Sequence, residues 1–247
     1  MVRKVVAESS PDSLVVVGSD HAHQFFLDNM PQFLLGKMER FDAIFYNEVR
    51  EFGIEPVILP GDIELAASLL EGAVERGVDL SFSNELKVDH SIVTPLHFVR
   101  PDHDLPIVPL MTNCVAPPMP TSRRLYEVGA ILREIIEGLP DDKRVAVIVS
   151  GHMSIEVGGP RQFLSGPTDE EFDDTVTRLI AEDRDPELID FCTFERMTQA
   201  GNATYQFANF ILAMGAKGEL GTCTYAEGMK RKGTTQGWFT WDPGARR

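Results

Sequence analysis

The chain has 247 residues, of which 43% are hydrophobic and 25% charged, a balance typical of a soluble globular enzyme with one large or two small α/β domains. Its formal net charge of −15 argues against a nucleic-acid binder or an anionic membrane surface as partner, because both require a basic footprint. No apolar run could span a bilayer, and the three cysteines form no paired motif, so we expect a cytoplasmic protein without a disulfide framework.

The chain begins with an unusual segment. Residues 1–8 read as the last turns of an amphipathic helix, followed by a turn at 9–12 and then a strand. A domain seldom opens on a helix with nothing before it to pack against, so we expect that an upstream strand is missing. The alternative is a frayed terminus.

Strand and helix patterns then alternate. Short runs rich in branched apolar residues predict strands at 13–18, 56–60, 78–83, 105–115 and 144–151, the last being the clearest buried strand. Apolar residues at helical spacing predict helices at 62–77, 120–140, 168–183 and 199–216. Gly77 marks one helix end, Thr121 or Ser122 caps the next helix, and Thr168 opens the third.

This alternation predicts an α/β fold, a single domain over 1–247 with a central mixed sheet flanked by helices. We find no internal repeat and no linker. The tail at 229–247 is basic and aromatic, and we expect an irregular C-terminal arm that packs on the body or on a partner subunit.

Three of the six histidines follow predicted strands. His21 comes after the strand at 13–18, His90 one loop after the strand at 78–83, and His152 after the strand at 144–151. Ligands bind beyond the carboxyl ends of strands in open α/β sheets, so these histidines are expected to share a site. Each alone is better explained as an ordinary polar residue. The remaining three, His23, His97 and His103, are expected to be surface or supporting residues.

Such a site suits a metal or proton transfer. Neutral imidazole binds iron, zinc, copper or nickel, and two histidines with one carboxylate form the facial triad of non-haem Fe(II) oxygenases. A histidine off the metal can move protons near neutral pH. No HExxH, P-loop, GxSxG or GxGxxG motif is present, which leaves a metal-dependent hydrolase using the same residues as a minor alternative.

Three segments resemble the signatures of a known family. They are GSDHAHQFFLDNMPQFLLG at 18–36, VDHSIVTPL at 88–96 and SGHMSIEVGGPR at 150–161. In this order they are similar to those of the type III extradiol ring-cleavage dioxygenases, the family of the catalytic subunit of protocatechuate 4,5-dioxygenase and of 2,3-dihydroxyphenylpropionate 1,2-dioxygenase. The segment at 109–137 also resembles the family's Asn-containing strand, Pro-rich loop and following helix.

The resemblance implies the family's fold and a non-haem Fe(II) ion that opens a catechol-type ring with O2. It implies that His21 is an iron ligand and that His90 lies beside the substrate and O2 as a catalytic residue. Asn113 is expected to contact the substrate. Arg161, like Arg123 and Arg124, could anchor a substrate carboxylate, because guanidinium binds carboxylates bidentately, although a surface ion pair is the simpler explanation.

The sequence departs from the family pattern in three ways. The family's first iron histidine lies upstream of the residues present. Ile155 stands where the family has its acid–base histidine, and Gln206 stands where it has the glutamate ligand. Isoleucine cannot carry a proton, and a neutral amide is a weak ligand. His152 could serve as the base instead, and Glu156 could supply a carboxylate, although each could equally be a supporting or solvated residue.

Two classes of function therefore follow. The chain is either an Fe(II)-dependent extradiol dioxygenase with altered site residues, or a catalytically silent subunit that pairs with an active relative. The resemblance also implies a homo-oligomer or a hetero-oligomer with a related subunit.

Overall fold

The computed structural model describes residues 1–244, and the chain divides into two compact units. The first comprises Met1–Met119 and Glu134–Ser150, and the second comprises Pro120–Arg133 and Gly151–Arg247. Helix α5 (Ser122–Glu137) is the one element shared between them, and the two units are described separately below. The expected single domain over 1–247 stays a prediction.

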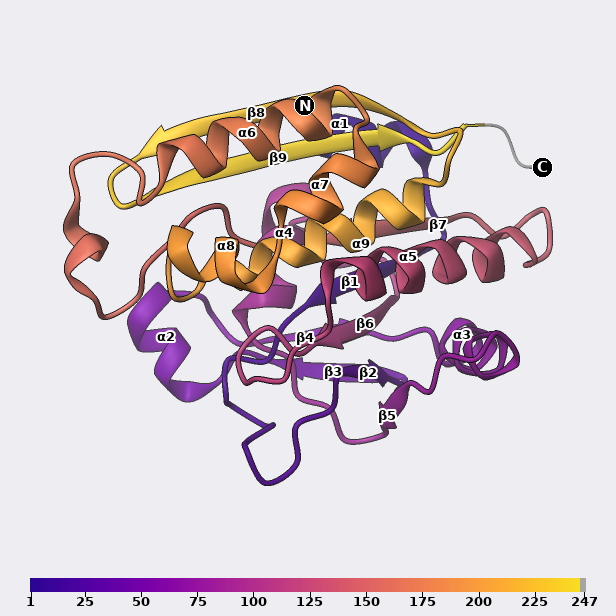
Figure 1. The fold of residues 1–247 in the computed structure, drawn as a ribbon. Helices are drawn as coiled ribbons and strands as arrows, with labels where there is room; N and C mark the ends of the chain where they lie inside the picture. Colours follow the sequence, from indigo (N-terminus) through magenta and orange to yellow (C-terminus); the bar gives the residue numbers. More distant parts are fainter. Residues whose placement is uncertain (245–247) are drawn as a thin grey trace. The chain divides into compact units, whose positions relative to one another are not determined.

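The first unit contains a five-stranded mixed sheet in the order β5-β2-β6-β1-β7 (Figure 1). Its strands are β1 (Ser13–Gly18), β2 (Phe33–Gly36), β5 (Ser81–Ser83), β6 (Ile107–Thr112) and β7 (Val145–Val149). β1 pairs in parallel with β6 and β7, β5 pairs in parallel with β2, and β2 runs antiparallel to β6. The prediction of an α/β fold with a mixed central sheet is confirmed.

Burial along the strands follows their place in the sheet. All six residues of β1 and all six of β6 are buried, because both strands have neighbours on either side. β7 lies at the sheet edge, and only Ile148 of its five residues is fully buried. The expectation that 144–151 forms the clearest buried strand is therefore wrong, since an apolar run does not distinguish a central strand from an edge strand.

Four helices accompany this sheet, namely α1 (Val2–Ser9), α2 (Tyr46–Phe52), α3 (Ile63–Glu75) and α4 (His90–Val99). α4 packs on β1 and α1 packs on α4, while α3 contacts β2 and β6. A separate antiparallel pair joins β3 (Arg40–Ala43) and β4 (Val57–Pro60). The core of the unit includes the fully buried side chains of Leu14, Phe41 and Ile92.

Most of the predicted helix ends and caps lie within one residue of those in the structure. Gly77 has the left-handed φ of 74° expected where a helix stops. Thr121 rather than Ser122 caps α5, because its Oγ1 accepts the backbone N–H of Arg124 at 3.2 Å. The helix at 168–183 begins one residue later than expected, with Asp169 as the cap.

The second unit is mainly helical before its final hairpin. It contains α6 (Glu170–Ala181), α7 (Asp185–Phe191), α8 (Phe194–Ala200) and α9 (Ala208–Lys217), with short 3-10 helices η1 (Pro160–Phe163) and η2 (Thr204–Phe207). The single helix expected over 199–216 is wrong. Helix α8 ends at Ala200 because the next residue, Gly201, has a φ of 150°, which residues with an L side chain rarely adopt.

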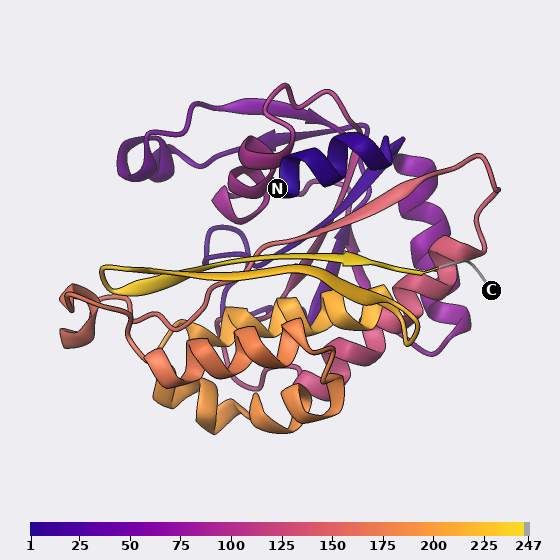
Figure 2. The same cartoon turned by 90° about the horizontal axis from the view of Figure 1, so that it is seen from above.

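The C-terminal tail is also more regular than expected. Strands β8 (Thr222–Arg231) and β9 (Thr234–Asp242) form an antiparallel hairpin that lies along α6, as Figures 1 and 2 show. The irregular arm predicted for 229–247 is therefore wrong up to Asp242, and 245–247 lie outside the described residues. Over the described part of the chain, no helix has the length and apolar character needed to cross a membrane.

Candidate metal and catalytic site

The polar turn after β1 is organised by Asp20. Its buried carboxylate accepts the backbone N–H groups of His23, Gln24 and Phe25 at 3.0–3.2 Å. Several hydrogen bonds to one carboxylate fix the path of a short turn that has no regular secondary structure. Asp20 therefore holds the turn, and the imidazoles of His21 and His23 are presented from it.

His21 is oriented by Asp89, the N-cap of α4. The Oδ2 atom of Asp89 lies 2.7 Å from His21 Nδ1 and accepts the His21 backbone N–H at 3.1 Å, while Oδ1 accepts the Ser91 N–H at 2.9 Å. The hydrogen bond places a proton on Nδ1 of the neutral ring and leaves Nε2 as the basic nitrogen. A carboxylate bonded in this way to the far nitrogen is the usual support of a metal-binding histidine.

Burial and hydrogen bonding act in opposite directions on Asp89. Burial raises the pKa of this carboxyl, but the hydrogen bond from His21 and the electrostatic interaction with the two histidines lower it more, so the pKa lies below its ordinary value. The side chain has no solvent exposure. Asp89 is therefore a buried anion at neutral pH.

His90, the first residue of α4, is oriented by Glu48 of α2. The Oε1 atom of Glu48 lies 2.5 Å from His90 Nδ1 and accepts the His90 backbone N–H at 3.0 Å. The Oε2 atom accepts the N–H of Phe45 at the start of α2, at 2.8 Å. His23 Nε2 lies 3.4 Å from Oε1, and its ring stacks on Phe45. Glu48 thus connects the start of α2, the turn after β1 and the start of α4.

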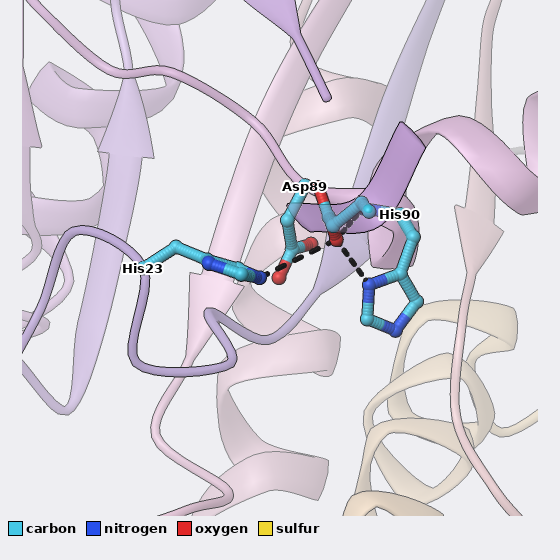
Figure 3. Close-up of side chains that lie close together, drawn as sticks. His23, Asp89 and His90 are labelled. Atoms are coloured by element: carbon cyan, nitrogen blue, oxygen red, sulfur yellow. Dashed lines mark hydrogen bonds and ion pairs between the residues drawn. The ribbon is translucent and has the colours of Figure 1, made fainter. Parts of the chain in front are cut away.

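These contacts form one carboxylate–histidine cluster, composed of His21, His23, Glu48, Asp89 and His90. The rings of His21 and His90 stack with their centroids 4.3 Å apart. Four of these residues, His23, Glu48, Asp89 and His90, each offer one potential ligand atom, and these four atoms lie within 4.8 Å of one another. Figure 3 shows His23, Asp89 and His90 pointing toward one another. Imidazole and carboxylate donors suit Fe(II) and other transition metals.

Asn113, the expected substrate contact, lies in the same unit directly after β6. Its Oδ1 accepts the N–H groups of Val115 and Ala116, and its Nδ2 donates to the carbonyls of Ala116 and Pro118. The side chain is buried and holds the Pro-rich loop in place. Its role toward a substrate stays a prediction.

The remaining predicted site residues belong to the second unit. Gln206 is buried in η2, and His152 is partly buried in the loop after β7. Arg161 donates from Nε to Glu156 Oε2 at 2.6 Å and from Nη1 to the carbonyl of Gln199 at 2.9 Å. The hydrogen bond from the Arg161 backbone N–H, with its guanidinium, lowers the pKa of Glu156.

The loop after β7, which carries His152, is held by a buried acid. Asp173 of α6 accepts the N–H and the hydroxyl of Ser154, both at 2.7 Å. Burial outweighs these hydrogen bonds and raises the pKa of Asp173. The adjacent Ile155 pairs with Thr234 of β9 through its backbone. The roles of His152, Gln206 and Arg161 stay predictions.

Sequence reasoning missed two members of the cluster and misjudged a third. Of the two alternatives for His23, a surface residue is wrong, since its partly buried imidazole lies 3.4 Å from Glu48, and a supporting residue stays a prediction. Asp89 lies inside the VDH motif, so the motif itself carried that signal. Glu48 lies in no motif, and it meets His90 across 42 residues of sequence. A contact of that separation comes from the packing of α2 and has no local sequence pattern.

Known proteins resemble this chain in sequence or in fold. A family model described as the catalytic LigB subunit of aromatic ring-opening dioxygenase matches residues 1–240. A 2,3-dihydroxyphenylpropionate/2,3-dihydroxicinnamic acid 1,2-dioxygenase of Pseudomonas putida is 34% identical over 146 residues, 59% of this chain and 44% of that protein. A Klebsiella pneumoniae enzyme named for the same reaction is 32% identical over 153 residues, 62% of this chain and 46% of its own.

The chain thus spans less than half the length of these relatives. Among solved structures, an uncharacterized protein from Escherichia coli K12 matches with a TM-score of 0.62. That match covers 95% of this chain and 88% of the other at 16% sequence identity, and it supports the fold alone.

Proposed function

The chain belongs to the family of the catalytic LigB subunit of aromatic ring-opening dioxygenases, and from that membership we propose that it is an Fe(II)-dependent extradiol dioxygenase. The substrate would be a catechol-type aromatic, and O2 the second reactant. The two curated relatives are named for dioxygenation of 2,3-dihydroxyphenyl compounds, which makes that class the first to test.

The observation that carries this proposal is the pairing of His21 with Asp89. The 2.7 Å contact at Nδ1 leaves Nε2 basic, and the buried anion behind the ring strengthens it as a metal ligand. The donor types in the cluster also fit the metal, since imidazole and carboxylate are the ligands of non-haem Fe(II) sites. When bound, Fe(II) supplies the redox chemistry with O2 that side chains lack.

The cluster also offers a proton carrier. Because Nδ1 of His90 faces Glu48, its Nε2 is the nitrogen that would accept a proton from a catechol hydroxyl as the substrate binds. Stacking against His21 and Phe52 limits the movement of this ring. We assign His90 the role of general base on this ground.

The family resemblance supplies the remaining proposed roles. His152 is the second proton carrier, and Gln206 is a neutral metal ligand. Asn113 and Arg161 are the substrate contacts. The amide of Gln206 brings no charge to the metal, and Ile155 brings no proton. These two residues favour a second candidate, a catalytically silent subunit that pairs with an active relative as a hetero-oligomer.

A direct assay separates the two candidates. Protein loaded anaerobically with Fe(II) would be mixed with 2,3-dihydroxyphenylpropionate and other catechols, and O2 uptake and the coloured ring-opened product would be followed. We expect activity in the wild type and at least a hundred-fold loss in His21→Ala. His97→Ala, an exposed histidine of α4, is the matched control. If the folded, iron-loaded wild type consumes no O2 with any catechol, the dioxygenase proposal is excluded and the catalytically silent subunit is the candidate that remains.

A further inference from the structure

A half-exposed aromatic ring borders the carboxylate–histidine cluster. Phe52, the last residue of α2, is 53% exposed, and its ring centroid lies 4.7 Å from that of His90. The two ring planes are tilted by 42°. Single exposed apolar side chains are common on protein surfaces and by themselves indicate no function. Phe52 differs from such residues because the ring that it contacts belongs to the cluster.

The end of α2 fixes the place of Phe52. Glu48 lies four residues earlier in the same helix, so the two side chains are on one helix face. That face is turned toward His90, since Glu48 Oε1 lies 2.5 Å from His90 Nδ1. The helix stops directly after Phe52, where Gly53 has a left-handed φ of 64° and donates its N–H to the Val49 carbonyl at 3.1 Å. The ring of Phe52 is therefore presented from a defined helix end.

We propose that Phe52 is a substrate contact, and that its exposed surface packs against the aromatic ring of the catechol. The inference deepens the proposed function and rests on it, because the catechol and the role of His90 as base come from there. The imidazole of His90 keeps 21% of its side-chain surface exposed, so a ligand can reach it. A catechol hydroxyl bonded to Nε2 would lie about 2.8 Å from it, which brings the catechol ring beside the imidazole that Phe52 already contacts.

The chemistry of phenylalanine defines what such a contact selects. An aromatic side chain pairs with another ring in an offset or edge-to-face arrangement, with the centroids about 4.5–7 Å apart. The ligand would also cover apolar surface that Phe52 otherwise exposes to water. Both interactions recognise the ring and make no use of the hydroxyls. They are made before and during the reaction alike, so they raise affinity for the substrate and leave kcat nearly unchanged.

A purely structural role for Phe52 predicts a different result. If Phe52 served to limit the movement of His90, its loss would disturb the base and lower kcat, while the affinity for the catechol would stay the same. A leucine would still fill much of the space beside His90, but it could not pair with a ring as an aromatic side chain does. The balance between affinity and kcat in Phe52→Leu therefore separates the two roles.

The test measures binding of 2,3-dihydroxyphenylpropionate to the Fe(II)-loaded protein by anaerobic calorimetry, where the absence of O2 prevents ring opening. Relative to the wild type, we expect about ten-fold weaker binding in Phe52→Ala, about three-fold weaker binding in Phe52→Leu and a change below about two-fold in Phe52→Tyr. Phe98→Leu is the matched control, because Phe98 is 48% exposed and lies about two turns after His90 on α4. Circular dichroism checks that each variant is folded.

The outcomes separate the inference from the proposed function. Weaker binding in Phe52→Ala and Phe52→Leu, with Phe52→Tyr and Phe98→Leu unchanged, supports the substrate contact even if no catechol is opened when O2 is admitted. Unchanged binding in both Phe52→Ala and Phe52→Leu overturns the contact, while O2 uptake by the same proteins would leave the dioxygenase standing. A lowered kcat with unchanged binding assigns Phe52 to holding His90 and also overturns the contact, as does a folded wild type that binds no catechol.

Discussion

Gly18, the last residue of β1, allows α4 to approach the sheet, and Gly18→Ala tests how closely the cluster depends on that approach. A Cβ atom there would lie 2.5 Å from Ser91 Oγ, 3.2 Å from Ser91 Cβ and 2.9 Å from Ile92 Cδ1. Ser91 cannot move without loss, because its hydroxyl donates to the Ser19 carbonyl at 2.9 Å and accepts the Ser19 N–H at 3.2 Å.

The cost follows from these contacts. Two buried hydrogen bonds contribute about 1 kcal/mol each, so displacing the Ser91 hydroxyl costs about 2 kcal/mol. The overlap with Ile92 remains and adds about 1 kcal/mol as overpacking. We expect Gly18→Ala to lower the free energy of unfolding by about 3 kcal/mol in total. Because Ser91 follows Asp89 and His90, we expect the same displacement to weaken Fe(II) binding.

Urea denaturation followed by far-UV circular dichroism measures this effect. Tryptophan fluorescence is a second probe that reports on the other unit, because Trp238 and Trp241 both lie in β9. In a Ser91→Ala background the same glycine substitution would cost only about 1 kcal/mol, since the hydroxyl is gone. A cost below 1 kcal/mol in the wild-type background, or equal costs in both backgrounds, would refute the reasoning.

Three further predictions concern stability. Burial raises the pKa of Asp169, but the hydrogen bonds from Arg196 and from the Phe172 backbone N–H outweigh burial, so the pKa lies below its ordinary value of 3.8. The stability that Asp169 contributes is therefore complete above pH 3.8 and is lost as the pH falls through the lowered pKa. The difference in unfolding free energy between the wild type and Asp169→Asn should be smaller at about pH 3 than at about pH 6. An equal difference at the two pH values would contradict this prediction. Phe172→Ala removes a fully buried ring that contacts Phe191 and Phe207, and we expect a loss of about 3–5 kcal/mol by urea denaturation, against which a loss under 1 kcal/mol would count. Asp62→Ala removes the cap of α3, where Oδ1 accepts the Leu65 N–H at 2.9 Å, and we expect a loss of about 1–2 kcal/mol, with no loss arguing against the cap.

The central strands and the two motif histidines could be predicted from the sequence. β1 and β6 are apolar runs bounded by polar turns, and such runs are reliable signals where both faces are buried. His21 and His90 follow from motifs that are contiguous in the chain. Local sequence carries these features because each depends on neighbours only a few residues away.

The errors arise where distant residues decide the structure. The burial of β7 depends on the absence of a neighbour on one side, which its own residues do not encode. The hairpin of β8 and β9 turns at Lys232 and Gly233, where Gly233 has a φ of 75°. The residues from 229 onward mix polar and apolar side chains, and this pattern does not indicate a strand. Glu48 reaches the cluster only because α2 packs there.

Asp89 has a consequence for how long an ion would stay bound. Its carboxylate starts α4 by accepting the Ser91 N–H, and it also holds both the backbone and the ring of His21. Opening of the first helical turn would release Asp89 and His90 together, so the escape of a bound ion is tied to local unfolding of this turn. Amide hydrogen exchange at residues 91–93 would then slow when the ion binds, and the residence time of the ion would follow the rate at which the turn opens.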